Sequence, residues 1–254
     1  MPLCLSFWRA PTDNDARWQT DDWKLYGLNV MTSQLRSFKV TKTSESTVHV
    51  VATMYLSPFV VAWGFNAVIE YTIDFSGSLT LQAKLQPIGR APKTVPRVGW
   101  NVQLDRRLDH ATWFGLGPGE SYHDKKSAQQ IGIYKAHTEH LQTPYEVPQE
   151  NGNRAEARWV NLHDEAGFGI KATYMPGKNE RRCFQWAACR HDAGVLERAR
   201  HPCDLRERDG VLWRLDCDNA GVGTAACGPG VCDKWKVPCR EFGFGFKLEP
   251  VVSS

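Results

Sequence analysis

The chain has 254 residues, of which 42% are hydrophobic and 23% charged, and its 31 Lys and Arg against 28 Asp and Glu give a formal net charge of +3. This composition excludes a disordered chain, and the length allows one large all-β domain or two small ones. Short basic clusters at Arg181-Arg182 and Arg198-Ala199-Arg200 have acidic residues close by, so we expect no nucleic-acid partner.

The first unusual segment is Trp8-Arg9-Ala10-Pro11-Thr12-Asp13-Asn14-Asp15, which precedes a short helical pattern at residues 15–26. Asp13 and Asp15 could pair with Arg9, cap the helix that follows, or bind a cation. Capping and buried ion pairing are the favoured interpretations.

Apolar residues then alternate with polar ones, as they do in strands that bury one face. Residues 38–40 and 48–56 form one such pair, joined through Ser44-Glu45-Ser46. Residues 69–73 and 79–85 form another around the turn at 74–78, and this pair predicts a β-hairpin. Residues 98–104 predict a further strand, in which Trp100 is expected to belong to the core.

Residues 113–122 form a strand that runs into the glycine-rich turn Gly115-Leu116-Gly117-Pro118-Gly119. A phosphate-binding loop needs a helix N-terminus behind it and a Gly-Lys-Ser/Thr ending, and neither is present. We interpret the segment as a structural turn.

Residues 144–154 combine a tyrosine, carboxylates, amides and an arginine, a mixture that suits hydroxyl recognition. An extended loop held by Arg154 is an equal alternative.

The last third of the chain predicts a short helix at residues 195–200, which Pro202 ends, and strands at 211–217 and 242–248. Residues 221–230 are nearly all small, which allows the backbone to approach another element or a ligand closely. Many strands, few helices and no Pro-, Gly- or Ser-rich linker predict one domain, residues 1–254, built as an antiparallel β-sandwich.

Several binding classes receive no support from the sequence. No stretch approaches the ~18 apolar residues of a membrane span, and the start of the chain does not look like a signal peptide. We therefore expect a cytoplasmic protein with no membrane partner. Seven of the eight cysteines follow residue 180, at spacings unlike those of structural zinc sites. We expect reduced, packed cysteines and no metal in this chain.

Four segments in order resemble the last domain of the long β-galactosidases of glycoside hydrolase family 2. Residues 7–15, beginning Phe7-Trp8-Arg9, look like the motif that opens that domain. Residues 114–124 resemble its Gly-x-Gly-Pro-x-Glu-x-Tyr-x-Asp segment, and residues 143–154 its Thr-Pro-Tyr-x-x-Pro-x-Glu-Asn-Gly-x-Arg segment. Residues 211–231 resemble its closing stretch. The order and spacing agree across essentially the whole chain.

The resemblance implies an all-β, galactose-mutarotase-like antiparallel β-supersandwich with one or two short helices. It also implies a retaining β-galactosidase whose two catalytic glutamates lie on a (β/α)8 barrel, in the same longer chain or in a separate large subunit. No catalytic residue is then expected here, and Mg²⁺ and Na⁺ would be bound by the barrel part. The expected partners are that barrel, a galactoside such as lactose, and further copies in an oligomer. The family-motif residues, mostly structural, are Trp8, Arg9, Asp13, Asn14, Asp15, Glu120, Tyr122, Tyr145, Glu150, Asn151 and Arg154.

The resemblance implies substrate-adjacent residues in two places. Asp74, Phe75, Ser76 and Gly77 occupy a family loop that shifts on ligand binding, although Phe75 replaces a glycine found in some relatives. Cys227 falls where well-known members place a tryptophan against the substrate, so we expect weaker sugar stacking there.

Two other functions stay open at this point. One is a stand-alone carbohydrate-binding sandwich. The other is an aldose mutarotase, which would need a His/Glu pair in one cleft, with His163, His191 and His201 as candidate histidines.

Overall fold

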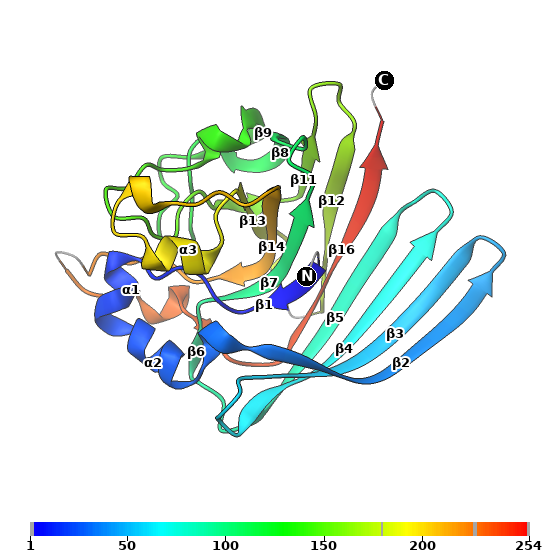
Figure 1. The fold of residues 1–254 in the computed structure, drawn as a ribbon, viewed down its shortest axis with the longest axis horizontal. Coiled ribbons are helices and arrows are strands. Elements are labelled where there is room, and N and C mark those ends of the chain that lie inside the picture. The colour runs from blue at the N-terminus through cyan, green and yellow to red at the C-terminus, as the bar shows by residue number, and fades with distance from the viewer. Residues whose placement is uncertain (1–2, 179, 226–227, 253–254) are drawn as a thin grey trace.

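The computed structural model describes residues 3–178, 180–225 and 228–252 as two antiparallel β-sheets with short helices at one end (Figure 1). The larger sheet has nine strands in the order β2-β3-β4-β5-β16-β12-β11-β8-β9. In chain order these are β2 (Thr32–Ser44), β3 (Thr47–Ser57), β4 (Trp63–Asp74), β5 (Leu79–Gly89), β8 (His110–Gly117), β9 (Gln130–His137), β11 (Trp159–His163), β12 (Gly169–Pro176) and β16 (Phe242–Val251).

The smaller sheet has five strands in the order β1-β7-β14-β13-β10. They are β1 (Leu3–Ser6), β7 (Arg97–Leu104), β10 (Arg154–Ala157), β13 (Phe184–Cys189) and β14 (Val211–Asn219). The two-residue strands β6 (Thr94–Val95) and β15 (Val237–Pro238) pair with each other. The predicted all-β antiparallel sandwich is confirmed.

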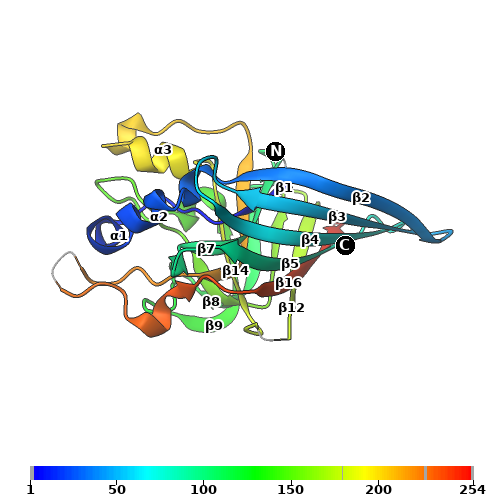
Figure 2. The same ribbon diagram turned by 90° about the horizontal axis from the view of Figure 1, so that it is seen from below.

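The predicted hairpins are present at the expected registers. In β4 and β5, Ile69 lies opposite Ala83 and Ile73 lies opposite Leu79. The hairpin formed by β2 and β3 is longer than predicted, because β2 has thirteen residues. Nearly all of β2 is exposed. Figure 2 shows these hairpins extending well beyond the rest of the molecule.

The core lies between the two sheets. Trp100 of the smaller sheet is fully buried, as predicted, and so is Trp213. Trp113 of the larger sheet packs edge-on against Trp186 of the smaller one, with ring centroids 5.3 Å apart. Because alternate residues of a strand point to opposite faces, the large apolar side chains of both sheets meet in this one layer.

Three short α-helices complete the fold: α1 (Asp13–Trp18), α2 (Thr20–Leu25) and α3 (Ala193–Arg198). Short 3₁₀ helices are η1 (Leu28–Val30), η2 (Thr138–Leu141), η3 (Pro202–Asp204) and η4 (Asp233–Trp235). The helix predicted at 15–26 is divided, because Gln19 leaves helical geometry at the junction of α1 and α2. Asp15 of α1 and Trp23 of α2 are both buried. The second predicted helix begins earlier than expected, because the Asp192 side chain caps it.

One half of the larger sheet has an inner face that the smaller sheet does not cover. Across one row, Val40, Val50, Tyr71, Leu81 and Phe246 lie side by side on this face. Leu81 and Phe246 are completely buried, whereas Val40 is 56% exposed. Neighbouring rows repeat the gradient. We call the exposed part the uncovered inner face, and its residues are Phe38, Val40, Val48 and Ile73.

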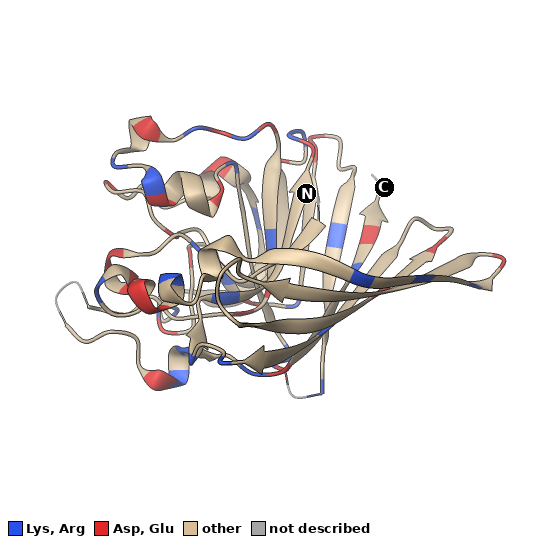
Figure 3. Ribbon diagram, turned by 60° about the horizontal axis from the view of Figure 1, so that its bottom comes forward, with Lys and Arg blue, Asp and Glu red and all other residues tan. Residues whose placement is uncertain are grey.

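The distribution of charge agrees with the composition, in which basic and acidic residues nearly balance. Lys and Arg are interspersed with Asp and Glu along the ribbon (Figure 3), so the small net charge is not gathered on one face. In the described ranges, no helix combines the length and the apolar character that crossing a membrane requires. All seven cysteines that these ranges contain are free, in agreement with the expectation of reduced thiols.

Candidate functional site

The outer face of the smaller sheet is largely polar, and along β14 it is buried. In β14 the outward-pointing residues Arg214 and Asp216 are as buried as the inward-pointing Trp213 and Leu215. The Arg97 guanidinium of β7 pairs with the Asp216 carboxylate, with Nε 2.9 Å from Oδ1. Buried charges are tolerated when they are paired and hydrogen-bonded. The four sequence motifs supply both the cover and the partners, and we call the resulting assembly the motif network.

Arg9 joins the first motif to the last. Its guanidinium forms a two-pronged ion pair with Asp15, at 2.8 to 3.1 Å. The same group donates to Asn219 Oδ1 (2.9 Å) and to the carbonyls of Ala220 (2.6 Å) and Gly221 (2.9 Å). Burial alone would lower the pKa of Arg9, but the adjacent Asp15 carboxylate outweighs it and raises that pKa. Arg9 therefore stays charged and holds the two ends of the chain together.

Asp15 also has the capping role that the sequence predicts. Its backbone N–H donates to the Thr12 hydroxyl (3.1 Å), and its carboxylate accepts the Thr12 N–H (3.0 Å). This reciprocal pair is the capping box of α1. Capping and ion pairing are thus combined in one side chain.

Glu150 joins the third motif to β14 and to the second motif. Its carboxylate accepts from Arg214 Nη1 at 2.5 Å and from the Tyr122 hydroxyl at 3.3 Å. Burial, with the nearby Glu150 charge, raises the pKa of Tyr122 well above its ordinary value. Burial would lower the pKa of Arg214, but the Glu150 carboxylate raises it. Tyr122 and Arg214 therefore each keep one protonation state at neutral pH, as a structural network requires.

Glu120 ties the second motif to the third at a less buried place. Its carboxylate accepts from the Gly152 N–H and the Tyr145 hydroxyl, each at 2.9 Å, and pairs with Lys125. Burial raises the pKa of Glu120, but the hydrogen bonds from Lys125 and Gly152 outweigh this effect and leave it below its ordinary value.

Glu120 should therefore contribute stability that depends on pH. A carboxyl whose pKa is depressed in the folded state stabilises the fold above its unfolded pKa, and the contribution is lost as pH falls through the folded value. We expect the difference in unfolding free energy between the wild type and Glu120→Gln to be largest above the ordinary value of 4.5 and to shrink in more acidic solution. Urea unfolding of both proteins between about pH 6 and pH 3 measures it. A difference that stays constant over this range would contradict the assignment.

Arg154 is held by backbone carbonyl groups. Its guanidinium donates to the carbonyls of Leu141 (2.8 Å), Gly152 (2.7 Å) and Pro118 (3.1 Å). Burial lowers the pKa of Arg154 to about 10, so it is still charged at neutral pH. The interpretation of residues 144–154 as a loop held by Arg154 describes this geometry. Asn151 supports the same loop, because its side chain bonds Thr143 N and Gln149 O.

The network holds the small-residue segment at 221–223 from two sides. The Asn14 side-chain amide donates to the carbonyls of Val222 (2.8 Å) and Gly223 (2.9 Å). The Asp124 carboxylate accepts the N–H groups of the same two residues, at 2.9 and 2.8 Å. A Cβ on Gly221 would lie 2.5 Å from an Asp124 oxygen. The glycine is therefore required by close approach to another element.

The other motif residues lie around this centre. Trp8 Nε1 donates to Glu197 of α3 (3.2 Å), and its ring packs edge-on against Trp23. Asp13 exchanges two hydrogen bonds with Gln149. Tyr145 contacts Glu120 and Lys125. The structure thus brings together all eleven residues that the motifs singled out.

Of the residues expected next to substrate, the structure describes the group at 74–77 and places it far from the motif network. Asp74, Phe75, Ser76 and Gly77 form the tip of the β4–β5 hairpin, at the opposite end of the molecule from the segment at 221–223 (Figures 1 and 2). The Asp74 carboxylate accepts from Ser76 N (2.9 Å), and Phe75 is 87% exposed. Cys227 lies outside the described residues. Contact of either place with substrate therefore stays a prediction.

Sequence reasoning did not single out several members of the network. Arg97, Arg214, Asp216 and Asn219 lie in strands whose alternation suggested one exposed face. A signal was present, because Arg214 and Asp216 place opposite charges at alternate positions of one strand. Such a pattern suits a buried, paired face as well as a solvated one.

The motif carboxylates Asp15, Glu120 and Glu150 are not free for acid–base or nucleophilic chemistry. Asp15 and Glu150 are buried and are each paired with an arginine, and Glu120 is paired with Lys125. A retaining glycosidase needs two reactive carboxyl groups ~5 Å apart that face the sugar. Of the candidate mutarotase histidines, His163 bonds Thr112 and the Asp164 carbonyl, not a glutamate.

Comparison with known proteins identifies relatives of the whole chain. The family model described as "Beta galactosidase small chain" matches residues 1–248. The chain is 33% identical over 246 residues to the β-galactosidase of Kluyveromyces lactis, a match that covers 96% of this chain and 23% of that protein. It is 28% identical to that of Arthrobacter sp., covering 89% and 24%, and 26% identical to that of Streptococcus thermophilus, covering 97% and 23%. The chain therefore spans about a quarter of the length of these relatives.

Solved structures give more distant matches. One is a galactose mutarotase related enzyme from Lactobacillus acidophilus, at 9% identity and a TM-score of 0.39, covering 86% of this chain and 72% of that one. Another is an aldose epimerase homologue from C. elegans, at 9% identity and a TM-score of 0.36, covering 86% and 70%.

Proposed function

Because the chain belongs to the β-galactosidase small-chain family, we propose that it is the non-catalytic part of a β-galactosidase. The whole enzyme would remove terminal non-reducing β-D-galactose from galactosides such as lactose, by the retaining mechanism. A catalytic barrel, in the same longer chain or in a separate large subunit, would supply both reactive glutamates and any Mg²⁺ or Na⁺. The observation that carries the proposal is that Asp15, Glu120 and Glu150 are each held by a basic side chain.

The proposed role in the sugar site is to present the segment at 221–231. Asn14 and Asp124 fix the backbone at its start. Exposed aromatic surface lies beside it, because Trp18 of α1 packs close to Gly230 and is 64% exposed. Aromatic rings stack well on the apolar faces of sugars. A segment held at 222–223, beside exposed aromatic surface, is suited to forming one wall of a carbohydrate pocket whose floor belongs to the barrel.

The proposed contact with the rest of the enzyme is the uncovered inner face. Phe38 and Val40 are 60% and 56% exposed on a face that is core elsewhere in the same sheet. Beside them, Leu5, Met31, Met54 and Tyr71 line a groove of about 570 Å³. Exposed apolar patches of this kind mark interaction sites. In the proposed enzyme, the three quarters of the related proteins that this chain does not span would supply the occupant of this face.

Complementation tests the function directly. The 254-residue chain and a separately expressed catalytic part of the enzyme are assayed for lactose hydrolysis, alone and after mixing. We expect activity only in the mixture, because only there does each part supply what the other lacks. Lactose hydrolysis by the purified chain alone would overturn the proposal, and so would a catalytic part whose activity the chain does not change. A cytoplasmic location and an oligomeric enzyme remain predictions.

A further inference from the structure

A row of histidines crosses one edge of the larger sheet, away from the motif network. His137 of the edge strand β9 lies directly opposite His110 of β8, and His110 lies directly opposite His163 of β11. Directly opposed residues in an antiparallel pair share one face of the sheet. The three rings are therefore neighbours, with centroids 5.2 Å apart for His110 and His137 and 5.7 Å apart for His110 and His163.

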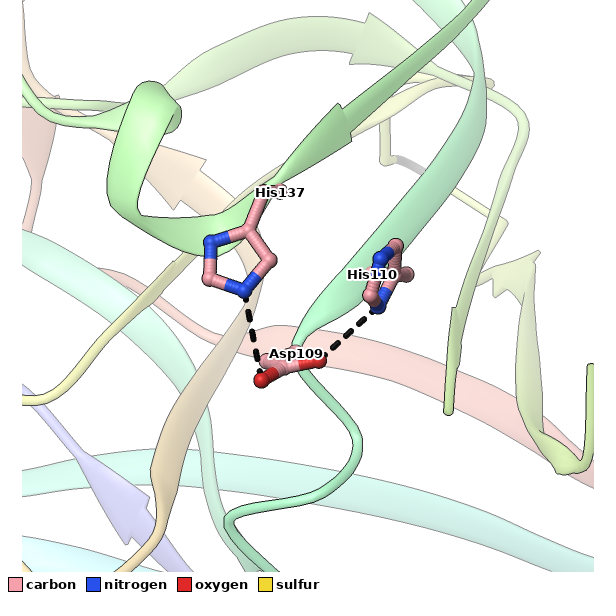
Figure 4. A group of neighbouring side chains, drawn as sticks. All are labelled: Asp109, His110 and His137. Atoms are coloured by element: carbon pink, nitrogen blue, oxygen red, sulfur yellow. Dashed lines mark hydrogen bonds and ion pairs between the residues drawn. The ribbon is translucent and has the colours of Figure 1, made fainter. Parts of the chain in front are cut away.

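Asp109 places a carboxylate between two of these rings. Its Oδ1 lies 2.8 Å from His110 Nδ1, and its Oδ2 lies 3.2 Å from His137 Nε2. Figure 4 shows both rings turning a nitrogen toward this carboxylate from adjacent strands. One ligand atom from each residue lies within 4.8 Å of the others, and in the described part of the chain no other group of three such side chains meets this condition.

The spacing suits a small divalent ion. Ligand atoms held tetrahedrally at ~2.0–2.1 Å from Zn²⁺ lie ~3.3 Å from one another, so modest rotations of these side chains would place an ion among them. Two imidazoles and a carboxylate form a donor set that suits Zn²⁺ and similar transition ions, whereas Mg²⁺ prefers oxygen ligands. The side chains are 36%, 22% and 27% exposed for His110, Asp109 and His137, so an ion can reach them.

The surroundings favour a cation. The Glu139 carboxylate lies 3.8 Å from His137 Nδ1, the ring nitrogen that faces away from Asp109. That nitrogen accepts the Glu139 N–H at 3.4 Å, a contact that ion binding through Nε2 would have to replace, because a metal-binding histidine donates its other ring N–H. Arg190 approaches Asp109 Oδ2 only to 3.9 Å, and it is also paired with Glu207 at 3.2 Å. The local balance of charged side chains is therefore negative.

We propose that Asp109, His110 and His137 bind one Zn²⁺-class ion, which links the edge strand β9 to β8. The ion replaces the protons that His137 Nε2 and His110 Nδ1 would otherwise donate to Asp109; each proton passes to the other nitrogen of its ring or to solvent, and water completes the coordination. This departs from the sequence expectation of no metal in the chain. It is independent of the proposed enzymatic role, because no motif residue takes part.

Metal titration of the full 254-residue chain tests the site. Co²⁺ is added near neutral pH and followed by its visible absorption, and Zn²⁺ binding is measured by calorimetry. We expect one site, with affinity reduced about tenfold or more in His137→Asn and in Asp109→Asn. His163→Asn is the matched control, because His163 lies in the same row but its nitrogens contact Thr112 and the Asp164 carbonyl.

Comparison among variants also separates this site from the thiols, because every variant keeps the same cysteines. Circular dichroism verifies that each variant is folded, and Zn²⁺ should raise the melting temperature of the wild type but not of the two ligand variants. Equal binding by the wild type, His137→Asn and Asp109→Asn would overturn the proposal, as would a wild type that binds no ion.

Discussion

Replacing Arg9 by alanine should destabilise the folded chain by about 3–5 kcal/mol, the amount typical of removing one partner of a buried ion pair. The change leaves the Asp15 carboxylate in a completely buried site without its cation. It also leaves the Asn219 oxygen and the carbonyls of Ala220 and Gly221 without their donor. The loss of unfolding free energy is measured by urea unfolding, as the decrease in the midpoint urea concentration when the slope m of the transition is unchanged.

Arg107→Ala is the matched control for this prediction. Arg107 also pairs with an aspartate nearby in sequence, Asp105, but its side chain is 78% exposed. Solvent screens an exposed pair of this kind, so this change should be nearly neutral. If Arg9→Ala is no more destabilising than Arg107→Ala, the motif network does not hold the chain ends together as described.

Replacing Val40 by aspartate should weaken reconstitution of the galactosidase by at least about 100-fold. Val40 belongs to the uncovered inner face, so in the isolated chain its side chain is partly exposed to water. The change should therefore leave the fold of the chain itself largely intact. In the assembled enzyme the new carboxylate would be buried without a partner, and the apolar contact would be lost as well. A 100-fold change corresponds to ~2.8 kcal/mol of association free energy.

The measurement is the chain concentration that restores half of the maximal lactose hydrolysis when the catalytic part is held constant. Thr41→Asp is the matched control, because it adds the same charge at the next position, on the opposite face of β2. An unchanged midpoint for Val40→Asp, or an equal shift for both variants, would show that the uncovered inner face is not the contact.

The hairpin elements could be predicted from the sequence because their determinants are local. Alternation in residues 69–73 and 79–85, with a Gly/Ser turn between them, requires only neighbouring residues to specify a register. The pairing of Arg9 with Asp15 and the capping of α1 were predictable for the same reason, since these residues lie within six positions of one another.

Contacts across the chain were not predictable in this way. Arg214 meets Glu150 across 64 positions, and Asn14 meets Val222 across 208. The resemblance indicated that these segments matter, but no spacing in the sequence states which side chain meets which. The same holds for His110 and His137, which become neighbours only through the register of β8 and β9.

The amino-acid sequence was sufficient to identify an all-β antiparallel sandwich, its hairpins, its short helices and its family, because periodicity and motif order are properties of the chain itself. Which faces of the strands are covered is a property of the assembled sheets. The polar outer face of β14 is buried because distant motifs fold over it, and the apolar face of β2 is exposed because the five-stranded sheet does not extend over it. Burial depends on what lies opposite in space, and alternation along one strand carries no information about that.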